Sequence, residues 1–357
     1  MTHPSSPSIL EAAVHGERLS AAQAEGLYSQ ADFHHLAQAA HTVRMAKHPD
    51  NVVTYVVDRN INYSNICVCA CRFCAFFRAP GQEGGFVISR DELFAKIEET
   101  LKLNGTQILL QGSHHPDLDL DFYTDMLASI KTRFPELHIH AFSPPEIAHL
   151  AQLTGTTPET IVQKLIQAGL DSIPGGGAEI LVDRVRRVVS PNKCSAGQWL
   201  DIMRTAHHLG LRTTATMMFG HVETPAERIQ HLLAIRELQD ETGGFTAFIP
   251  WSFQPDNTRL SGRKATSIEY LRLLALSRLV LDNMDNLQVS WVTMGSKIGQ
   301  LALFFGANDF GSTMIEENVV AASGVRFRMS TGNIETCITQ AGFTPKQRRM
   351  NYDLINS

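Results

Sequence analysis

The sequence predicts an α/β protein built on a parallel (β/α)8 barrel of the TIM type, preceded by a helical extension. Strand-like and helix-like segments alternate between residues 52 and 310, and this alternation is typical of parallel sheets covered by helices. The chain has 357 residues and is 43% hydrophobic, which suffices for a barrel of about 250 residues with extensions. We expect a helical extension at 1–50, the barrel at 51–345 and a C-terminal tail at 346–357.

The first fifty residues have the pattern of consecutive helices. Ser8 and Ser20 each begin a capping-box pattern, in which a side chain and the backbone satisfy each other's hydrogen bonds at a helix start. A third helix is expected over 32–47, ending before Pro49. We expect this extension to cover one end of the barrel.

The barrel strands are predicted from short runs rich in β-branched and aromatic residues. Between them lie amphipathic stretches that suit covering helices, and residues 58–60 are expected to form a turn. In parallel barrels the chemistry lies on loops after the C-terminal ends of the strands, so candidate site residues are sought there. The predicted strands are 52–57, 61–65, 107–111, 138–142, 171–173, 213–219, 246–251, 287–291 and 307–310.

Composition and charge exclude several functions. The formal net charge of −5 argues against a nucleic-acid-binding surface, and no stretch approaches the roughly 20 apolar residues that span a bilayer. The N-terminus lacks the basic and apolar regions of a signal peptide. Four of the six cysteines lie in one short loop, a pattern that fits a reducing compartment. We therefore expect a cytoplasmic protein without nucleic-acid or membrane partners.

The loop after the second predicted strand carries the strongest chemical signal. Cys67, Cys71 and Cys74 have the spacing C-x3-C-x2-C, and Phe73 precedes the last of them. Three close thiolates suit an iron–sulfur cube, in which each cysteine ligates a separate iron. Cys69 sits too near its neighbours to reach a fourth corner easily. One iron is therefore expected to stay open to a substrate or cofactor.

Other interpretations of these cysteines stay open on spacing alone. A zinc site takes four Cys or His ligands, and His115 or His140 could supply the fourth. A disulfide framework is disfavoured in a long chain with six cysteines. An electron carrier or metal-stabilised scaffold would need a fourth protein ligand at a matching distance. Cys194 and Cys337 stand alone and are expected to be inert, packed thiols.

The cysteine spacing resembles that of the radical S-adenosylmethionine (SAM) superfamily, whose members bind SAM at the open iron of a 4Fe-4S cluster. One group in it, the futalosine-pathway enzymes of menaquinone biosynthesis with the deazaflavin-cofactor synthases, is similar at residues 61–67, 71–78, 111–112, 174–179 and 220–224. The dehypoxanthine futalosine cyclases are most similar at 177–187, 190–191, 243–251 and 311–318. The resemblance extends from about residue 16 to residue 349.

This resemblance implies a radical SAM cyclase of the oxidoreductase type. A 5′-deoxyadenosyl radical would take a hydrogen from the ribose of dehypoxanthine futalosine, and the sugar radical would attack the benzoate ring. Loss of one electron and one proton would then give cyclic dehypoxanthine futalosine. The alternatives within the group are aminofutalosine synthase and deazaflavin-cofactor synthase. A reducing electron donor such as flavodoxin or ferredoxin is implied as a partner.

The resemblance and the strand ends together supply the candidate site residues. Cys67, Cys71 and Cys74 are expected to hold the metal cluster. Glycines after the predicted strand 171–173 form a turn whose N–H groups suit an anion. Candidates for SAM binding are Phe73, Gln111, Gly112, Ser143, Glu146 and Met218; for substrate binding, Arg59, Arg78, Gly176 and Gly177; and for the proton-accepting base, Glu223, His221 and Asp309.

Each of these candidates also has a structural interpretation. Glu146 follows two prolines and could complement the dipole at a helix start. His221 could be a satisfied core histidine, and the glycine turn could serve only backbone freedom. Trp251 and Phe253, near the end of the predicted strand 246–251, could either wall a flat aromatic substrate or pack in the core.

Overall fold

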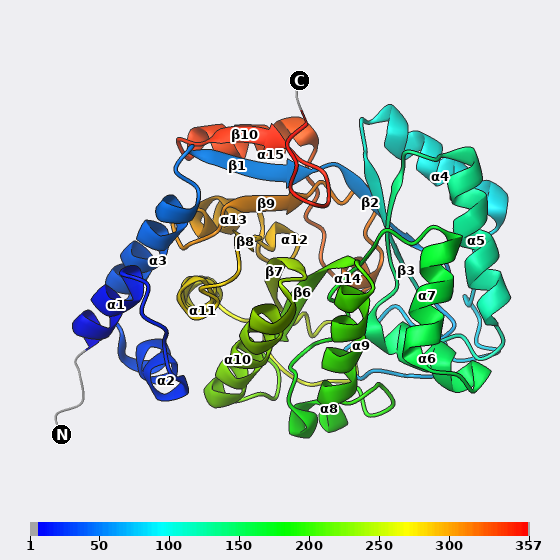
Figure 1. The fold of residues 1–357 in the computed structure, drawn as a ribbon, viewed down its shortest axis with the longest axis horizontal. Helices are drawn as coiled ribbons and strands as arrows, with labels where there is room; N and C mark the ends of the chain where they lie inside the picture. Colours follow the sequence, from blue (N-terminus) through cyan, green and yellow to red (C-terminus); the bar gives the residue numbers. More distant parts are fainter. Residues whose placement is uncertain (1–5, 356–357) are drawn as a thin grey trace.

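The computed structural model describes residues 6–355 and has a curled parallel sheet at its centre, surrounded by helices (Figure 1). Seven strands lie side by side in chain order: β2 (Asp58–Asn62), β3 (Gln107–Gln111), β4 (His138–Ala141), β5 (Ser172–Ile173), β6 (Arg212–Phe219), β7 (Phe245–Ser252) and β8 (Asn286–Leu287). A second sheet has the order β10 (Thr344–Gln347), β1 (Val52–Val56), β9 (Asp309–Ser312). All strand pairs in both sheets are parallel.

Backbone hydrogen bonds join the two sheets into one barrel. β1 and β2 form a single extended run that is interrupted only at Val57. β9 pairs with β1 on one side, and on the other side Asp309 bridges Gln288, directly after β8. The chain after β9 then runs beside β2, because the Ile315 N–H donates to the Asp58 carbonyl. The barrel is thus closed, which confirms the predicted fold class.

Helices cover the outside of the barrel (Figure 1). Many of them begin where the sequence provides a cap: at α10, Thr224 and Glu227 bond each other's backbone N–H groups. The covering helices are α4 (Arg90–Lys102), α5 (Leu120–Arg133), α6 (Pro144–Thr154), α7 (Pro158–Ala168), α8 (Asp183–Val189), α9 (Ala196–His208), α10 (Pro225–Thr242), α11 (Ser267–Val280), α13 (Ser296–Ala302) and α15 (Thr331–Gln340). The short helices α12 (Trp291–Met294) and α14 (Val319–Ala322) instead line the barrel interior.

The N-terminal extension is helical, as predicted, within the part that the structure describes. Its helices are α1 (Ser6–Val14), α2 (Ala21–Gln30) and α3 (Phe33–Lys47). They pack against α10 and α11 on the outside of the barrel, with Leu27 and Leu36 fully buried. The Arg228 guanidinium of α10 also bonds the Tyr28 hydroxyl of α2. The extension is therefore attached to the helical layer of the barrel.

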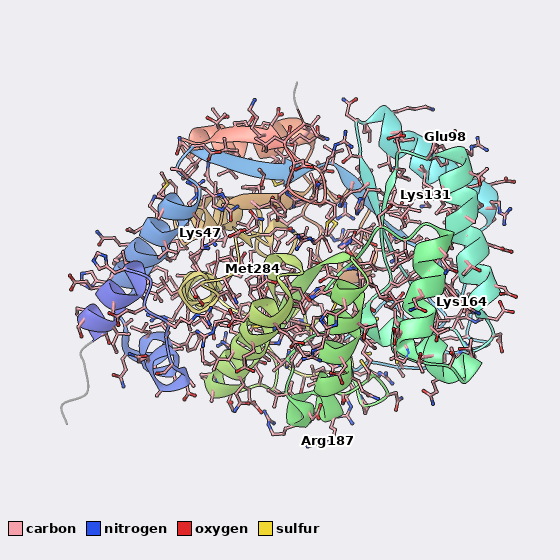
Figure 2. All side chains as sticks on the ribbon, viewed as in Figure 1. Lys47, Glu98, Lys131, Lys164, Arg187 and Met284 are labelled. Carbon is pink, nitrogen blue, oxygen red and sulfur yellow. The ribbon has the colours of Figure 1, made fainter. Side chains whose placement is uncertain are left out.

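Side chains fill the space between sheet and helices. Ile108, Ile139 and Leu165 have no exposed surface, whereas charged residues such as Lys164 and Arg187 lie at the periphery (Figure 2). Burial of this apolar surface is the main stabilising contribution, at about 25 cal/mol per Å². Within residues 6–355, no helix has the combined length and apolar character needed to cross a bilayer.

Three local predictions were wrong. Residues 58–60 are not a turn but belong to β2, whose polar side chains at alternate positions face the barrel interior and hide the usual apolar pattern. The predicted strand at 287–291 is limited to Asn286–Leu287, and Trp291 begins α12. The sequence analysis also missed β10, which pairs with β1.

Candidate functional site

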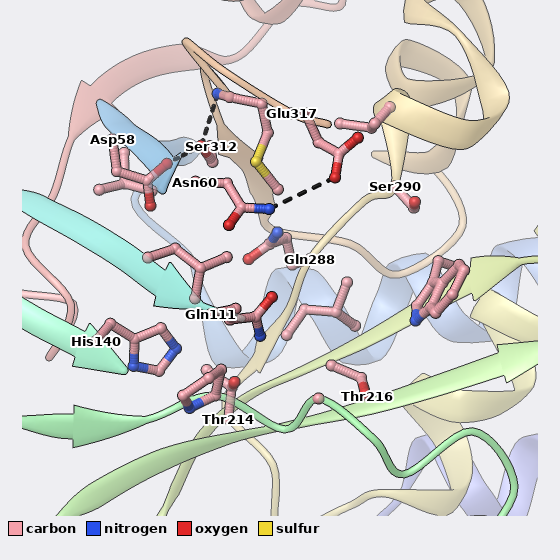
Figure 3. Close-up of a pocket in the computed structure, with 18 of the residues that line it drawn as sticks. Asp58, Asn60, Gln111, His140, Thr214, Thr216, Gln288, Ser290, Ser312 and Glu317 are labelled. Carbon is pink, nitrogen blue, oxygen red and sulfur yellow. Dashed lines mark hydrogen bonds between the residues drawn. The ribbon is translucent and has the colours of Figure 1, made fainter. Parts of the chain in front are cut away.

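The barrel encloses a cavity of about 270 Å³, shown in Figure 3. Side chains from β1 to β4, from β6 and β7, and from the segments after β8 and β9 line it. Trp251 and Trp291 contribute aromatic surface, and Asn60, Gln111 and Gln288 contribute carboxamide groups. The cavity therefore offers both flat apolar walls and hydrogen-bonding groups, a combination typical of small-molecule sites.

The cysteine loop follows β2 at its C-terminal end, where a parallel barrel carries its chemistry. Backbone bonds fold the loop back on itself: the Cys67 N–H donates to the Arg78 carbonyl at 2.9 Å, and the Arg78 N–H donates to the Asn65 carbonyl at 2.8 Å. The Arg78 guanidinium donates to the Phe77 carbonyl at 2.9 Å and to two preceding carbonyls at longer distances. It does not line the cavity. Arg78 thus braces the loop rather than facing a substrate there.

The donor set of the loop fits a 4Fe-4S cluster. The six cysteines are all free thiols, and a cubane binds each thiolate at a separate iron. The structure does not gather three or more His, Cys, Asp or Glu side chains of the described residues into a metal-binding group, so the fit rests on the number, chemistry and spacing of the three thiols. Cys69 lies between two of these cysteines, because its thiol hydrogen-bonds the side chains of Cys67 and Cys71. Its sulfur also lies 3.0 Å from His114 Nδ1 and 3.3 Å from the Asn192 carbonyl oxygen.

The two histidines considered as zinc ligands have other partners. His140 lies in β4 with its Nδ1 2.6 Å from the Ser172 hydroxyl. His115 Nδ1 accepts from the Asp117 N–H at 3.1 Å. Burial lowers the pKa of both imidazoles, so each is held neutral where it stands.

A partly buried lysine that the sequence pattern did not indicate lies beside the cysteine loop. The Lys193 ammonium lies 2.9 Å from Glu179 Oε1 and 5.2 Å from the centre of the Phe73 ring. Burial lowers the pKa of Lys193, but the Cys71 thiolate and the Glu179 carboxylate outweigh burial and hold this pKa well above its usual value. The structure therefore keeps a positive charge beside the thiolates. Lys193 is distant from the cysteines in sequence, which gave no signal of this contact.

Glu146 and Ser143, two SAM-binding candidates, form hydrogen bonds with neighbouring groups of the protein. One carboxylate oxygen of Glu146 accepts from the Tyr63 hydroxyl at 2.6 Å and the Gly112 N–H at 3.2 Å. The other accepts from the Ser143 N–H at 2.7 Å and its hydroxyl at 2.6 Å. A side chain at Gly112 would place its Cβ 2.3 Å from the Tyr63 ring. Glu146 therefore caps α6 and fixes the strand end that carries Gly112.

The glycine turn after β5 presents its backbone to the cavity. A Cβ at Gly175 would lie 2.7 Å from the Ala215 Cα, so only glycine allows this approach to β6. Gly176 and Gly177 line the cavity, as does the neighbouring Gln111 side chain. Met218 is fully buried in β6 and does not line it. The structure thus brings Gln111, Gly176 and Gly177 together, but not Met218.

The base candidates His221 and Glu223 form a closed network. His221 Nδ1 accepts from the Val222 N–H at 2.8 Å and its Nε2 lies 2.9 Å from the Met218 carbonyl, an arrangement that fits a neutral imidazole. Glu223 accepts from the Gly220 and His221 N–H groups and from Arg228 at 2.7 Å. Neither side chain is exposed, and neither lines the cavity. The network fixes the turn after β6.

Asp309 and Arg59 also face away from the cavity. Asp309 is fully buried, accepts from Thr54 at 2.5 Å, and forms a two-point ion pair with Arg348. Arg59 points outward from β2, and its guanidinium lies 2.8 Å from Glu99 of α4. The expectation that these residues meet the substrate is not supported by their placement.

Three carboxylates line the cavity among the described residues, and the sequence analysis named none of them. They are Asp58 on β2, Glu179 after β5, and Glu317 before α14. A signal for Asp58 existed, because alternation within β2 turns Asp58 and Asn60 to the same face. Burial raises the pKa of both Asp58 and Glu317. The cavity therefore holds acidic groups that can exist protonated or ionised.

Comparisons with known proteins agree with this site. A family model described as "Radical SAM superfamily" matches residues 61–235, and one described as "CofH/MqnC C-terminal region" matches residues 242–357. Cyclic dehypoxanthine futalosine synthase of Halalkalibacterium halodurans is 47% identical, covering 98% of this chain and 95% of that protein. The Streptomyces coelicolor protein of the same name is 44% identical, with 97% and 88% covered.

A second kind of relative is named for a different activity. The 5-amino-6-(D-ribitylamino)uracil–L-tyrosine 4-hydroxyphenyl transferase 1 of Methanosarcina barkeri is 44% identical, covering 85% of this chain and 82% of its own. Among solved structures, methylornithine synthase (PylB) superposes with a TM-score of 0.73 at 17% identity, covering 94% and 97% of the two chains.

The hydrogenase maturase HydG superposes with a TM-score of 0.74 at 15% identity, covering 96% of this chain and 75% of that one. At such identities, these structures support the barrel fold alone. Radical SAM enzymes use a 4Fe-4S cluster and SAM, as the cysteine loop predicts. The family models and the near full-length identity show that this chain belongs to the radical SAM superfamily, in the family of the cyclic dehypoxanthine futalosine synthases.

Proposed function

We propose that this enzyme converts dehypoxanthine futalosine to cyclic dehypoxanthine futalosine, a step of menaquinone biosynthesis. The 47% identity to a cyclic dehypoxanthine futalosine synthase over 98% of this chain carries the proposal. The transferases named above match 85 to 90% of the chain at 38 to 44% identity, so they are the second candidate. The cavity, with aromatic walls and carboxamides, suits a substrate that has both a benzoate ring and a sugar.

Cys67, Cys71 and Cys74 would hold the 4Fe-4S cluster, with the Lys193 ammonium offsetting part of the charge of the three thiolates. When bound, the cluster and SAM supply the 5′-deoxyadenosyl radical, and the protein supplies binding and orientation. The glycine turn and Gln111 meet at the cavity wall between β3 and β6. We assign SAM binding to this wall, with Phe73 beside the cluster cysteines.

The substrate is placed by neutral groups in this proposal. Among the described residues that line the cavity, Arg348 is the only lysine or arginine, and its guanidinium is paired with Asp309. The Gln111 and Gln288 side chains form no hydrogen bond to any residue that the structure describes, so their amides are available to the polar ends of a substrate. Trp251 and Trp291 would border the benzoate ring.

The C-terminal tail contributes to the cavity wall. Arg348, Met350 and Tyr352 line the cavity, and the Arg348 guanidinium lies 3.9 Å from the centre of the Tyr352 ring. The Arg348 N–H also donates to the Tyr55 carbonyl of β1 at 2.8 Å. This attachment supports a role in excluding water and oxygen from a radical reaction.

The test is reconstitution of the enzyme with iron and sulfide under anaerobic conditions, followed by reduction and addition of SAM and dehypoxanthine futalosine. We expect a product that is lighter than the substrate by two hydrogens. One molecule of 5′-deoxyadenosine should form for each molecule of this product. Flavodoxin or ferredoxin, the proposed physiological donors, should replace the chemical reductant. Turnover of tyrosine with 5-amino-6-(D-ribitylamino)uracil, or an adenosyl adduct without free 5′-deoxyadenosine, would contradict the proposal.

A further inference from the structure

The proposed cyclisation needs a proton acceptor that faces the substrate. When the sugar radical has joined the benzoate ring, the attacked ring carbon still carries its hydrogen, and aromaticity returns only when this hydrogen leaves as a proton. None of the predicted base candidates, Glu223, His221 and Asp309, lines the cavity. The acceptor is therefore sought among the carboxylates that do.

Two of the three cavity carboxylates are less suited to accept this proton. Glu179 is bonded by the Lys193 ammonium at 2.9 Å and by the Arg186 guanidinium at 3.3 Å. Two cations stabilise the ionised form and make this carboxylate a weak base. Asp58 accepts from the Gln107 amide at 2.8 Å with one oxygen and from the Ser312 hydroxyl with the other. It begins β2, at the end of that strand farther from the cysteine loop.

Glu317 differs from both of these carboxylates. Its side chain is 3% exposed, and no lysine or arginine side chain of the described residues bonds its carboxylate. Backbone N–H groups of Val319, Val320 and Ala321 donate to it at 2.8 to 3.1 Å. Burial raises the pKa of this carboxyl, and these N–H groups and the charge of Arg328 oppose the increase without cancelling it. A carboxylate in such surroundings is a stronger base than an exposed one.

Asn60 lies next to Glu317 across the cavity wall (Figure 3). Its amide nitrogen lies 3.5 Å from Glu317 Oε1, a long and weak hydrogen bond. Its amide oxygen is buried and has no partner in the structure. Buried polar atoms are nearly always satisfied, so an unpartnered oxygen beside a cavity carboxylate indicates that a bound molecule completes the pair.

We propose that Glu317 is the catalytic residue that accepts the ring proton, and that Asn60 positions the Glu317 carboxylate and accepts a hydrogen bond from a substrate hydroxyl. The ring C–H bond breaks, its proton forms an O–H bond on Glu317, and its electron pair returns to the ring. The remaining unpaired electron passes to an oxidised iron–sulfur centre, which is reduced by one electron. This inference rests on the proposed function.

The experiment compares the reconstituted wild-type enzyme with E317Q, which keeps the shape of the side chain but removes its basicity. We expect E317Q to bind substrate and to form 5′-deoxyadenosine, while cyclic product falls by about 10²-fold, the lower range for loss of a general base. The cyclised substrate radical should accumulate and be visible by electron paramagnetic resonance. E317D, which restores a carboxylate, should recover part of the product.

E316Q is the matched control, because Glu316 is the adjacent carboxylate but lies 2.7 Å from Lys96 and does not line the cavity. It should keep the wild-type ratio of 5′-deoxyadenosine to product. A second readout is the pH profile: product formation should fall below the pKa of Glu317 in the wild type, and E317Q should lack this decrease. Arg328 and the substrate carboxylate are the charged groups that would shift the pH at which this decrease occurs.

The outcomes separate the two proposals. Wild-type ratios of product to 5′-deoxyadenosine in E317Q would overturn the role of Glu317. Loss of substrate binding in E317Q, measured by quenching of tryptophan fluorescence, would likewise overturn it in favour of a scaffold role. A wild-type enzyme that makes no cyclic product would instead refute the proposed function, whatever E317Q does.

Discussion

Glu223 and Glu317 both lie at the C-terminal side of the barrel with their carboxyl groups buried, yet their surroundings shift their pKa values in opposite directions. Arg228 and two backbone N–H groups bond Glu223. Burial raises the pKa of Glu223, but the charges around it and these N–H groups outweigh burial, so the pKa is lowered. For Glu317 burial prevails and the pKa is raised. Glu223 is paired with a cation away from the cavity, whereas Glu317 lines the cavity and no lysine or arginine side chain of the described residues bonds its carboxylate.

The same contrast separates the other polar residues around the site. Glu146 and Arg78 bond the turns on which they stand, whereas Gln111 and Gln288 face the cavity without a partner in the described residues. Because folded proteins satisfy their buried polar groups, unused hydrogen-bonding capacity is the better marker of a binding residue. Position at the end of a strand is by itself a weaker marker of a binding residue.

The largest effect is expected in the cysteine loop, where Cys67, Cys71 and Cys74 are predicted to bind iron and Cys69 is not. In C67S the cluster should be lost, with product below detection, because one iron loses its thiolate. C69S is the control, since Cys69 hydrogen-bonds Cys67 and Cys71 but is not one of the three predicted cluster ligands. Iron content and visible absorption check both variants. Equal iron loss in C69S would show that Cys69 ligates the cluster.

A large effect on stability is expected at Glu223. In E223Q the Arg228 guanidinium loses its buried counter-ion, and breaking such a pair costs about 3–5 kcal/mol of unfolding free energy. Urea unfolding near neutral pH measures this loss. E98Q removes a partner from the exposed pair with Arg133 and should cost about 1 kcal/mol or less. Equal losses in the two variants would contradict the scaffold role of Glu223.

The effect of E223Q should also depend on pH. Because the folded-state pKa of Glu223 is lowered, its stabilising contribution is complete above its unfolded value of about 4.5 and is lost as pH falls through the folded-state value. The difference in unfolding free energy between wild type and E223Q should therefore shrink at acidic pH. A difference that stays constant down to about pH 3 would show that the carboxylate charge is not the cause.

The sequence was sufficient for the fold and for the cluster, because both depend on local patterns. Capping boxes, alternation of strands and helices, and the spacing of Cys67, Cys71 and Cys74 are all short-range features. The sequence also indicated the structural role of Glu146, because Ser143-x-x-Glu146 is a capping-box pattern. The prediction that Glu146 binds SAM was the part that this capping pattern did not support.

The cavity residues could not be predicted in the same way. Asp58 and Asn60 interrupt an apolar strand pattern, so the sequence predicts a turn there. In the structure both residues lie in β2 and line the cavity. Glu317 lies in an irregular segment after β9, where no periodicity indicates which side chains point inward. Lys193 meets the cysteine loop only through the tertiary fold. Such contacts depend on long-range packing, which one sequence does not specify.

The smallest effect is expected at Gln288, whose amide faces the cavity, and its comparison with Gln300 tests the contrast directly. Q288L should raise the KM for the substrate, lowering kcat/KM by about 2- to 10-fold for one lost hydrogen bond, with little change in stability. Gln300 donates to the Cys337 carbonyl at 2.9 Å on the outer layer. Q300L should therefore leave KM unchanged and lower the unfolding free energy by about 1 kcal/mol. If Q288L lost stability but kept its KM, Gln288 would belong with the scaffold residues.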